Sequence, residues 1–381
     1  MTLEEVLARH INSYPEIQIQ DMVKLIYQNE FGRGHFIKDK KASLLKLEQE
    51  FSSLKKNLDK GSNESNNAHV GELFEDIGNN LVRLNLLPLL TKKCGTGTNP
   101  GAGNNMPVEL STVNSFFVNT ANSISGKKKR FEEKLGIFRK CCKDGLLPFT
   151  ITEADNYLED YRAKGYPPVS HSEIYRQAYR PAYRIVDARY RRFFDVFCRI
   201  DSLLRTRDRV NVAIDGNCCA GKSTLAGLIG NVYGCNCNIF CMDDFFLPRE
   251  LKTKERLDEP GGNVDYERFR EEVIGGINRG REFQYRKYDC RSGTFNEIVK
   301  VTPGKLNIIE GSYSMHPALV ENYDLKIFLG IDEEEQRRRV LERNGPGMYE
   351  MFVQLWIPLE NRYFSGLGIR EQSDLVYNGA G

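Results

Sequence analysis

The sequence predicts an α/β fold in its second half, where a parallel sheet of about five strands is flanked by helices. A mainly α-helical domain is predicted to precede it. From Arg209 onward, short apolar runs alternate with helical or loop segments, and these runs are RVNVAIDG, NIFCMDD, KLNIIEG and DLKIFLGI. This alternation is typical of βαβ units that bury a parallel sheet on both faces. Before Arg209, apolar residues recur with helical spacing instead.

Length and composition set broad limits. A chain of 381 residues is long for one core, so we expect a helical domain at 1–195 and an α/β domain at 205–381. Its 54 basic and 52 acidic side chains give a net charge of +2, which provides no overall attraction to nucleic acid or membrane. No apolar run reaches about 18 residues, and the N-terminus lacks an apolar signal core. Ten irregularly spaced cysteines favour reduced thiols, so we expect a cytoplasmic protein.

The N-terminal half contains four apolar segments, of which the first, second and fourth have clear helical spacing. Their apolar positions are Ile19, Met22, Val23 and Ile26; Leu44, Leu47, Phe51 and Leu54; Phe74, Ile77, Leu81 and Leu84; and Phe131, Leu135, Phe138 and Cys142. We expect all four to belong to the helical domain. A segment rich in glycine and asparagine lies at 94–105. Because no strand precedes it and no Lys-Ser or Lys-Thr pair follows it, a surface loop is favoured over a phosphate-binding loop.

The segment 171–209 is basic, and most of it shows a helical pattern that is interrupted at Pro181. Tyr175, Tyr179 and Tyr183 fall on one helical face, with arginines between them. We interpret this as a tyrosine stripe that faces a core, with arginines on the solvated face. Nucleic-acid binding through this segment is the alternative, because interleaved arginine and aromatic residues also occur in such sites.

A phosphate-binding loop follows the first strand of the α/β half. The segment GNCCAGKS at 216–223 matches G-x-x-x-x-G-K-[ST], and it lies between a predicted strand and a predicted helix. In such a loop the backbone N–H groups and the helix N-terminus bind phosphate oxygens. The lysine reaches the β- and γ-phosphates of ATP, and the serine hydroxyl binds Mg²⁺. The predicted nucleotide-binding residues are Gly216, Asn217, Cys218, Cys219, Ala220, Gly221, Lys222, Ser223 and Thr224.

Three acids end later strands of the predicted sheet. Asp243 and Asp244 follow the second apolar run, and Glu310 closes the third. Ligands of open parallel sheets bind beyond the carboxyl ends of the strands, so these carboxylates should face the phosphate-binding loop. We expect Ser223, Glu310 and Asp243 to hold Mg²⁺.

Four arginines lie on the predicted helix after the fourth run. Phosphoryl transfer needs cations that neutralise the charge developing on the transferred group. Of Arg337, Arg338, Arg339 and Arg343, we favour the last two, because a spacing of four places them on one helical face.

The C-terminal half resembles the uridine kinase and phosphoribulokinase branch of P-loop kinases, which also includes pantothenate and glycerate kinase-like members. The resemblance covers about residues 209–378. It rests on IDGNCCAGKST, MDDFFLP, NVDYERF, YRKYDCRSG, IIEGSYSMHP, YDLKIFL and RRRVLERN, which occur in the order of that branch. It implies the P-loop NTPase type of sheet.

The resemblance also implies roles for individual residues. In that branch the first Asp of the MDDFFLP motif acts on the acceptor hydroxyl, which points to Asp243 rather than Asp244. Asp265 matches the aspartate that binds substrate hydroxyls, and Tyr288 matches a tyrosine near the acceptor. The motifs that contain Asp265 and Tyr288 should wall the acceptor pocket, where Arg291 could contact a carboxylate or carbonyl.

The sequence departs from the pyrimidine-specific members at two positions. Their histidine five residues after the tyrosine is replaced by Gly293, and their aromatic residue before the aspartate is replaced by Val264. We therefore expect a kinase that uses ATP and Mg²⁺ on a small hydroxyl-bearing metabolite, with a nucleoside as first candidate. A pantothenate- or glycerate-type kinase is the first alternative. A nucleotide-binding regulatory or RNA-binding protein is the second. The oligomeric state is not indicated.

Overall fold

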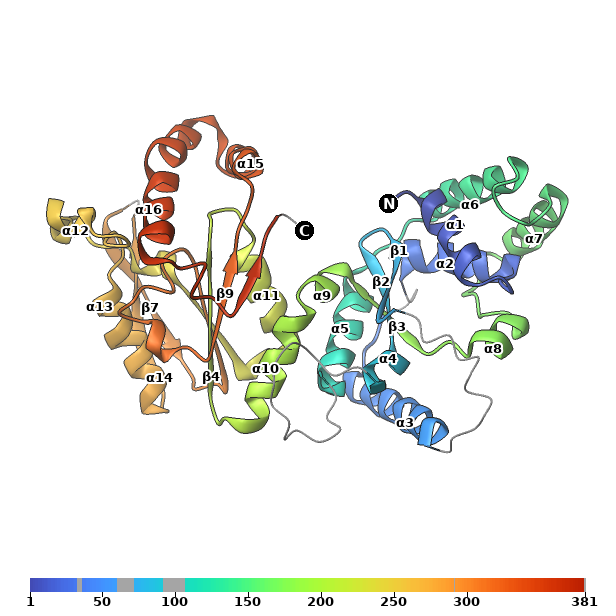
Figure 1. Cartoon of the computed structure of the whole chain (residues 1–381), viewed down its shortest axis with the longest axis horizontal. Coiled ribbons are helices and arrows are strands. Elements are labelled where there is room, and N and C mark those ends of the chain that lie inside the picture. The colour runs from blue at the N-terminus through green and yellow to red at the C-terminus, as the bar shows by residue number, and fades with distance from the viewer. Residues whose placement is uncertain (33–35, 60–71, 92–106, 291, 380–381) are drawn as a thin grey trace. The chain divides into compact units, whose positions relative to one another are not determined.

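The computed structural model describes residues 1–32, 36–59, 72–91, 107–290 and 292–379. The chain divides into two compact units, unit 1 at Met1–Asp195 and unit 2 at Val196–Gly381 (Figure 1). Within the described ranges, no helix is long and apolar enough to cross a membrane. The glycine- and asparagine-rich segment at 94–105 lies outside the described residues.

Unit 1 is mainly helical, as predicted, and also contains a small sheet. Its helices are α1 (Leu3–Ser13), α2 (Ile19–Phe31), α3 (Lys40–Asp59), α4 (Leu86–Thr91), α5 (Leu110–Ser123), α6 (Lys128–Lys143), α7 (Ile151–Ala163), α8 (Glu173–Tyr179) and α9 (Ala188–Arg192). The strands β1 (Phe74–Gly78), β2 (Leu81–Asn85) and β3 (Tyr183–Asp187) form an antiparallel sheet in the order β1-β2-β3.

This sheet corrects two expectations. The apolar segment from Phe74 to Leu84 is a hairpin, because Asn79 and Asn80 have φ values of 55° and 57°. Two consecutive positive φ values form the type of tight turn that joins antiparallel strands. The segment 171–209 is also not one helix: it forms α8, β3, α9 and α10 (Phe194–Thr206) in succession. Tyr175 is therefore buried on a helix, whereas Tyr183 lies on a strand.

Unit 2 is built on a five-stranded parallel sheet, as predicted. The strands are β4 (Val210–Gly216), β5 (Cys237–Cys241), β8 (Leu306–Glu310), β9 (Leu325–Leu329) and β10 (Leu375–Tyr377), in the order β10-β9-β4-β8-β5. All four strand pairs are parallel. Every residue of β4 and of β8 is buried, as expected for central strands that are covered on both faces. A separate antiparallel hairpin consists of β6 (Phe283–Asp289) and β7 (Thr294–Val301).

Helices surround this sheet. They are α11 (Lys222–Tyr233), α12 (Lys254–Asp258), α13 (Tyr266–Phe269), α14 (Gly275–Arg279), α15 (Glu333–Met351) and α16 (Ile357–Leu367). In Figure 1, α15 and α16 lie together at one end of the unit. Helix α10 belongs largely to unit 2, because Phe197 stacks on Tyr233 at 6.4 Å and Asp201 accepts a hydrogen bond of 2.8 Å from the Tyr233 hydroxyl.

The strand order places a ligand crevice beside β4. The chain leaves β4 for β5 on one side and later reaches β9 on the other side, with β8 inserted between β4 and β5. Loops that leave neighbouring strands in opposite directions open a crevice at the carboxyl ends of those strands. The loop after β4, the turn after β5 and the end of β8 therefore meet there.

Candidate active site

The loop between β4 and α11 has the backbone conformation that phosphate binding requires. Gly216 and Gly221 have φ values of 132° and 100°, and Cys219 has a φ of 62°. A Cβ atom on Gly216 would overlap the Leu329 carbonyl oxygen and lie 2.8 Å from the Leu329 nitrogen on β9. Only glycine permits this approach, and the next amide, of Asn217, donates 3.1 Å to the Leu329 carbonyl oxygen.

Lys222 is held inside this loop. Its Nζ donates to the carbonyl oxygens of Gly216 and Asn217 at 2.7 and 2.9 Å, and it lies 3.2 Å from Ser312 Oγ. The side chain is 9 % exposed. The three contacts fix the ammonium group at the start of α11, where the helix N-terminus also favours anions.

Ser223 and Glu310, two of the three residues expected to hold Mg²⁺ with Asp243, contact each other. The Ser223 hydroxyl donates to Glu310 Oε1 at 3.0 Å. Parallel pairing aligns Glu310 with Ile214 of β4 and with Cys241 of β5, so it sits at the centre of the crevice. Burial raises the pKa of the Glu310 carboxyl. A hydroxyl and a buried carboxylate are hard oxygen donors that fit Mg²⁺, whose charge would favour the ionised carboxylate.

The two aspartates after β5 have different environments. They lie on a short 3₁₀ helix, Met242–Phe245. Asp243 is exposed and lines a cavity together with Lys222. Asp244 accepts 3.4 Å from the Tyr285 hydroxyl and lies 3.8 Å from Lys287 Nζ. Asp244 therefore supports the β6–β7 hairpin, whereas Asp243 remains available to a ligand.

This cavity, which we call the P-loop cavity, has a volume of about 620 Å³. Of the predicted loop residues, Cys218, Cys219, Gly221, Lys222, Ser223 and Thr224 line it, while Gly216, Asn217 and Ala220 do not. The other sides come from the segment after β5, from Cys290 after β6, from the end of β8 and the loop that follows it, and from α15, α16 and the segment between these two helices. A volume of this size falls within the range of about 300–1,000 Å³ that is usual for small-molecule sites.

The structure separates the four arginines of α15 into two sets. Arg339 and Arg343 line the P-loop cavity, and Arg339 donates 3.3 Å to the Cys219 carbonyl oxygen. Arg337 and Arg338 are exposed and form ion pairs along the helix surface, for example 2.7 Å between Arg337 and Glu333. The helix therefore presents Arg339 and Arg343, and not Arg337 and Arg338, to the candidate nucleotide site.

Two of the three residues expected to contact the acceptor, Asp265 and Tyr288, do not line this cavity. Asp265 caps α13 by accepting 3.0 Å from the Arg268 amide, and its other oxygen lies 3.2 Å from Arg268 Nε. Tyr288 is 5 % exposed and packs edge-on against Phe295. Neither belongs to the described lining of the P-loop cavity. Arg291 lies outside the described residues.

Two buried carboxylates beside the loop were not identified from the sequence. Asp215 Oδ1 accepts from the amides of Gly216 and Tyr313, and its Oδ2 accepts from the amide of Met315 and from the Tyr363 hydroxyl. These hydrogen bonds lower the pKa of Asp215, but burial has the larger effect and raises the pKa to about 6. The sequence signal was present, since a charged residue near the end of a mostly apolar strand needs partners.

The second missed carboxylate is Glu360 on α16. It is 6 % exposed, accepts 2.9 Å from the Cys218 amide and accepts 2.7 Å from the Ser312 hydroxyl. It lines the P-loop cavity. No local pattern around position 360 indicates this role, because the contact joins residues that are 142 positions apart in the chain.

Comparisons with known proteins give similarity at the level of structure. No protein-family model matches the sequence, and no curated protein matches it. A possible uridine kinase from Bacillus stearothermophilus is similar at 19 % identity over 50 % of this chain and 99 % of its own, with a TM-score of 0.39. D-glycerate 3-kinase from Cryptococcus neoformans var. grubii is similar at 16 % identity over 48 % of this chain and 92 % of its own, with a TM-score of 0.34. The chain is thus similar to each of these two structures over about half its own length.

Proposed function

We propose that unit 2 is an ATP-dependent kinase that transfers the γ-phosphoryl group to a hydroxyl of a small metabolite. The observation that carries this proposal is the composition of one cavity. It combines a phosphate-binding loop, the Ser223–Glu310 pair, an exposed Asp243 and two arginines. These are the parts that phosphoryl transfer needs, namely phosphate positioning, metal binding, acceptor positioning and charge neutralisation.

Each group has a role that follows from its place. Lys222 and the loop amides bind the phosphates, and Arg339 and Arg343 stabilise charge on the transferred group. Ser223 and Glu310 would hold Mg²⁺, which supplies neutralisation of the phosphate oxygens. Asp243 accepts a hydrogen bond from the acceptor hydroxyl, because it is an exposed carboxylate in the lining of the P-loop cavity.

A ribonucleoside is the first candidate acceptor, from the resemblance. An acidic acceptor of the glycerate or pantothenate type is the second, and one observation favours it. A Cβ atom on Gly293 would lie 3.7 Å from Arg249 Nε and 3.8 Å from the Tyr288 hydroxyl. An arginine therefore lies beside the position where pyrimidine-specific kinases carry a histidine, and a guanidinium group suits a carboxylate.

The test is ADP release in the presence of ATP and Mg²⁺, measured against ribonucleosides, 2′-deoxyribonucleosides, glycerate and pantothenate. Turnover with ribonucleosides supports the first candidate, and turnover with an acid alone supports the second. The matched control is Asp243→Asn, which should remove acceptor-dependent turnover. ADP release that is equal with and without every acceptor would contradict a metabolite kinase and favour the regulatory or RNA-binding alternative.

A further inference from the structure

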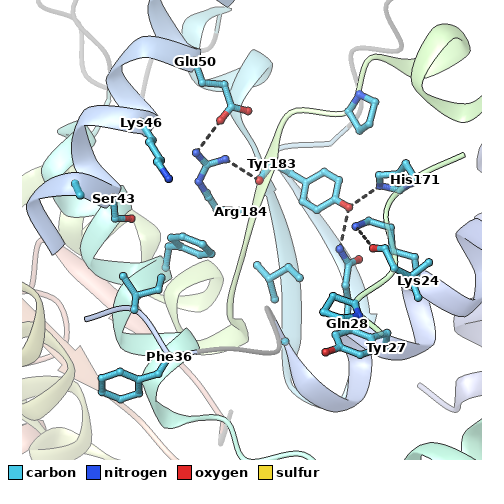
Figure 2. Close-up of a pocket in the computed structure, with 18 of the residues that line it drawn as sticks. Lys24, Tyr27, Gln28, Phe36, Ser43, Lys46, Glu50, His171, Tyr183 and Arg184 are labelled. Carbon is cyan, nitrogen blue, oxygen red and sulfur yellow. Dashed lines mark hydrogen bonds and ion pairs between the residues drawn. The ribbon is translucent and has the colours of Figure 1, made fainter. Parts of the chain in front are cut away.

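Unit 1 contains a pocket of about 580 Å³ that has no part in the proposed kinase reaction. We call it the α2–α3 pocket, since residues of α2 and α3 form two of its walls and β3 lies between them (Figure 2). Residues 168, 169 and 171 also line it. Its volume is within the range of about 300–1,000 Å³ for small-molecule sites.

One wall of this pocket is a fixed network of buried polar groups. The Tyr183 hydroxyl accepts 2.9 Å from Gln28 Nε2 and lies 2.7 Å from His171 Nε2. His171 Nδ1 lies 2.8 Å from Asp21 Oδ1, so this nitrogen carries the proton and Nε2 accepts from Tyr183. Gln28 Oε1 in turn accepts 2.8 Å from Arg83. Burial lowers the pKa of His171 to about 4, which leaves the imidazole uncharged at neutral pH.

The charged groups around the pocket have a positive excess. Its described lining contains four cationic side chains, Lys24, Lys38, Lys46 and Arg184, and two carboxylates, Asp39 and Glu50. Glu50 is already paired with Arg184 at 2.7 Å. In Figure 2, Lys46 and Arg184 lie on one side of the pocket, and Lys24 lies on the other.

Lys24 is the cation that most needs a counter-charge. It is partly buried, and its Nζ donates 2.9 Å to the Val169 carbonyl oxygen. Burial, followed by repulsion from Arg83, lowers the pKa of Lys24 to about 8 although Asp21 opposes the shift. An anion bound beside this ammonium group would stabilise its charged form and restore a higher pKa.

The pocket also offers apolar surface. The Phe36 side chain, at one edge of the pocket in Figure 2, is 61 % exposed, which is high for a large aromatic residue. Phe117 is buried beneath the Arg184 guanidinium. Small-molecule sites usually combine such apolar surface with a few polar groups that fix orientation.

We propose that the α2–α3 pocket is a second ligand site, which binds a small organic anion through Lys24 and Lys46. The ligand lies in the pocket between these two side chains, which Figure 2 shows on opposite sides, and its uncharged part lies against the apolar part of the lining. The ligand is small because the pocket has the volume of a metabolite site. It is anionic because the described lining has four cations and two carboxylates, of which Glu50 is already paired with Arg184.

The test is calorimetric titration of the full chain carrying Lys222→Met, so that phosphate binding at the P-loop does not contribute. The probes are inorganic phosphate, a ribonucleoside 5′-monophosphate, citrate and an uncharged ribonucleoside. We expect an anionic probe to bind at least tenfold more tightly than the uncharged one. Lys24→Met and Lys46→Met should each weaken that binding about tenfold or more, as expected for loss of a charge-assisted contact.

The control is Lys56→Met, which removes an exposed lysine from the same helix as Lys46 without touching the pocket. It should leave binding unchanged. Lys46 is exposed, so its variant will fold even if replacement of the more buried Lys24 disturbs packing. The proposal is overturned if no anionic probe binds with a dissociation constant below about 10 mM. Binding that is equal in the Lys46→Met and Lys56→Met variants also overturns it.

Discussion

Replacing Gly216 by alanine tests whether the phosphate-binding loop depends on close contact with β9. The new Cβ would overlap the Leu329 carbonyl and would sit at a φ of 132°, which side chains rarely adopt. The backbone conformation alone costs about 1–3 kcal/mol. The overlap is with main-chain atoms, which cannot move without separating β4 from β9, so we expect a total loss of about 3 kcal/mol or more.

The matched control is Gly227→Ala in the helix that follows the loop. No atom lies within 4 Å of a Cβ at Gly227, and alanine in a helix interior is more stable than glycine by about 0.5–1 kcal/mol. The chain has one tryptophan, Trp356, which lies in unit 2 and lines the P-loop cavity. Its fluorescence during urea unfolding therefore reports the stability of unit 2. If Gly216→Ala changes that stability by less than about 1 kcal/mol and retains ATP affinity, the proposed role of the contact is wrong.

Three further predictions concern the site and the boundary of unit 2. Asp243→Asn should retain ATP binding and lose about 10²–10⁴-fold in turnover, whereas Asp244→Asn should lose less turnover. If initial-rate assays show the larger loss for Asp244→Asn, the roles of the two aspartates must be exchanged. The hydrogen bond from the neighbouring thiol lowers the pKa of Cys219 to about 7, so its alkylation should accelerate as pH rises through 7 and slow when ATP is bound. Equal labelling of wild type and Cys219→Ser, measured by mass spectrometry, would contradict this. A fragment 194–381 should bind ATP. A fragment 202–381 should be unstable, because it lacks the buried apolar side chains of the first half of α10, such as Phe197 and Ile200, which contribute about 1.5–3 kcal/mol each. Thermal melting should show a lower melting temperature for the shorter fragment.

The sheet of unit 2 could be predicted because its signals are local. Each central strand is an apolar run, and the loop at 216–223 combines glycines, a lysine and a serine within eight positions. The carboxyl ends of parallel strands share one edge of the sheet, so the sequence also predicts that Asp243 and Glu310 face the loop. The order β4-β8-β5, which brings these strands side by side, comes from the structure.

Other features depend on contacts between distant segments. Phe74, Ile77, Leu81 and Leu84 have spacings that fit a helix as well as strands, and only the Gly-Asn-Asn turn at 78–80 distinguishes the two. Strand β3 pairs with β2, which lies about a hundred residues earlier in the chain. The local sequence around β3 does not contain this partner, so the helical pattern of the residues on either side was extended across the strand. The same applies to Glu360, which reaches the P-loop only through tertiary packing.

The proposed reaction of unit 2 is transfer of the γ-phosphoryl group to a metabolite hydroxyl. The most direct measurement uses ATP labelled in the γ-phosphoryl group and identifies the product that receives the label. The proposed roles of Asp243 and of the Ser223–Glu310 pair predict that label appears on an acceptor hydroxyl, requires Mg²⁺, and is lost in Asp243→Asn. Label found exclusively in inorganic phosphate, at the same rate with and without acceptors, would contradict the claim.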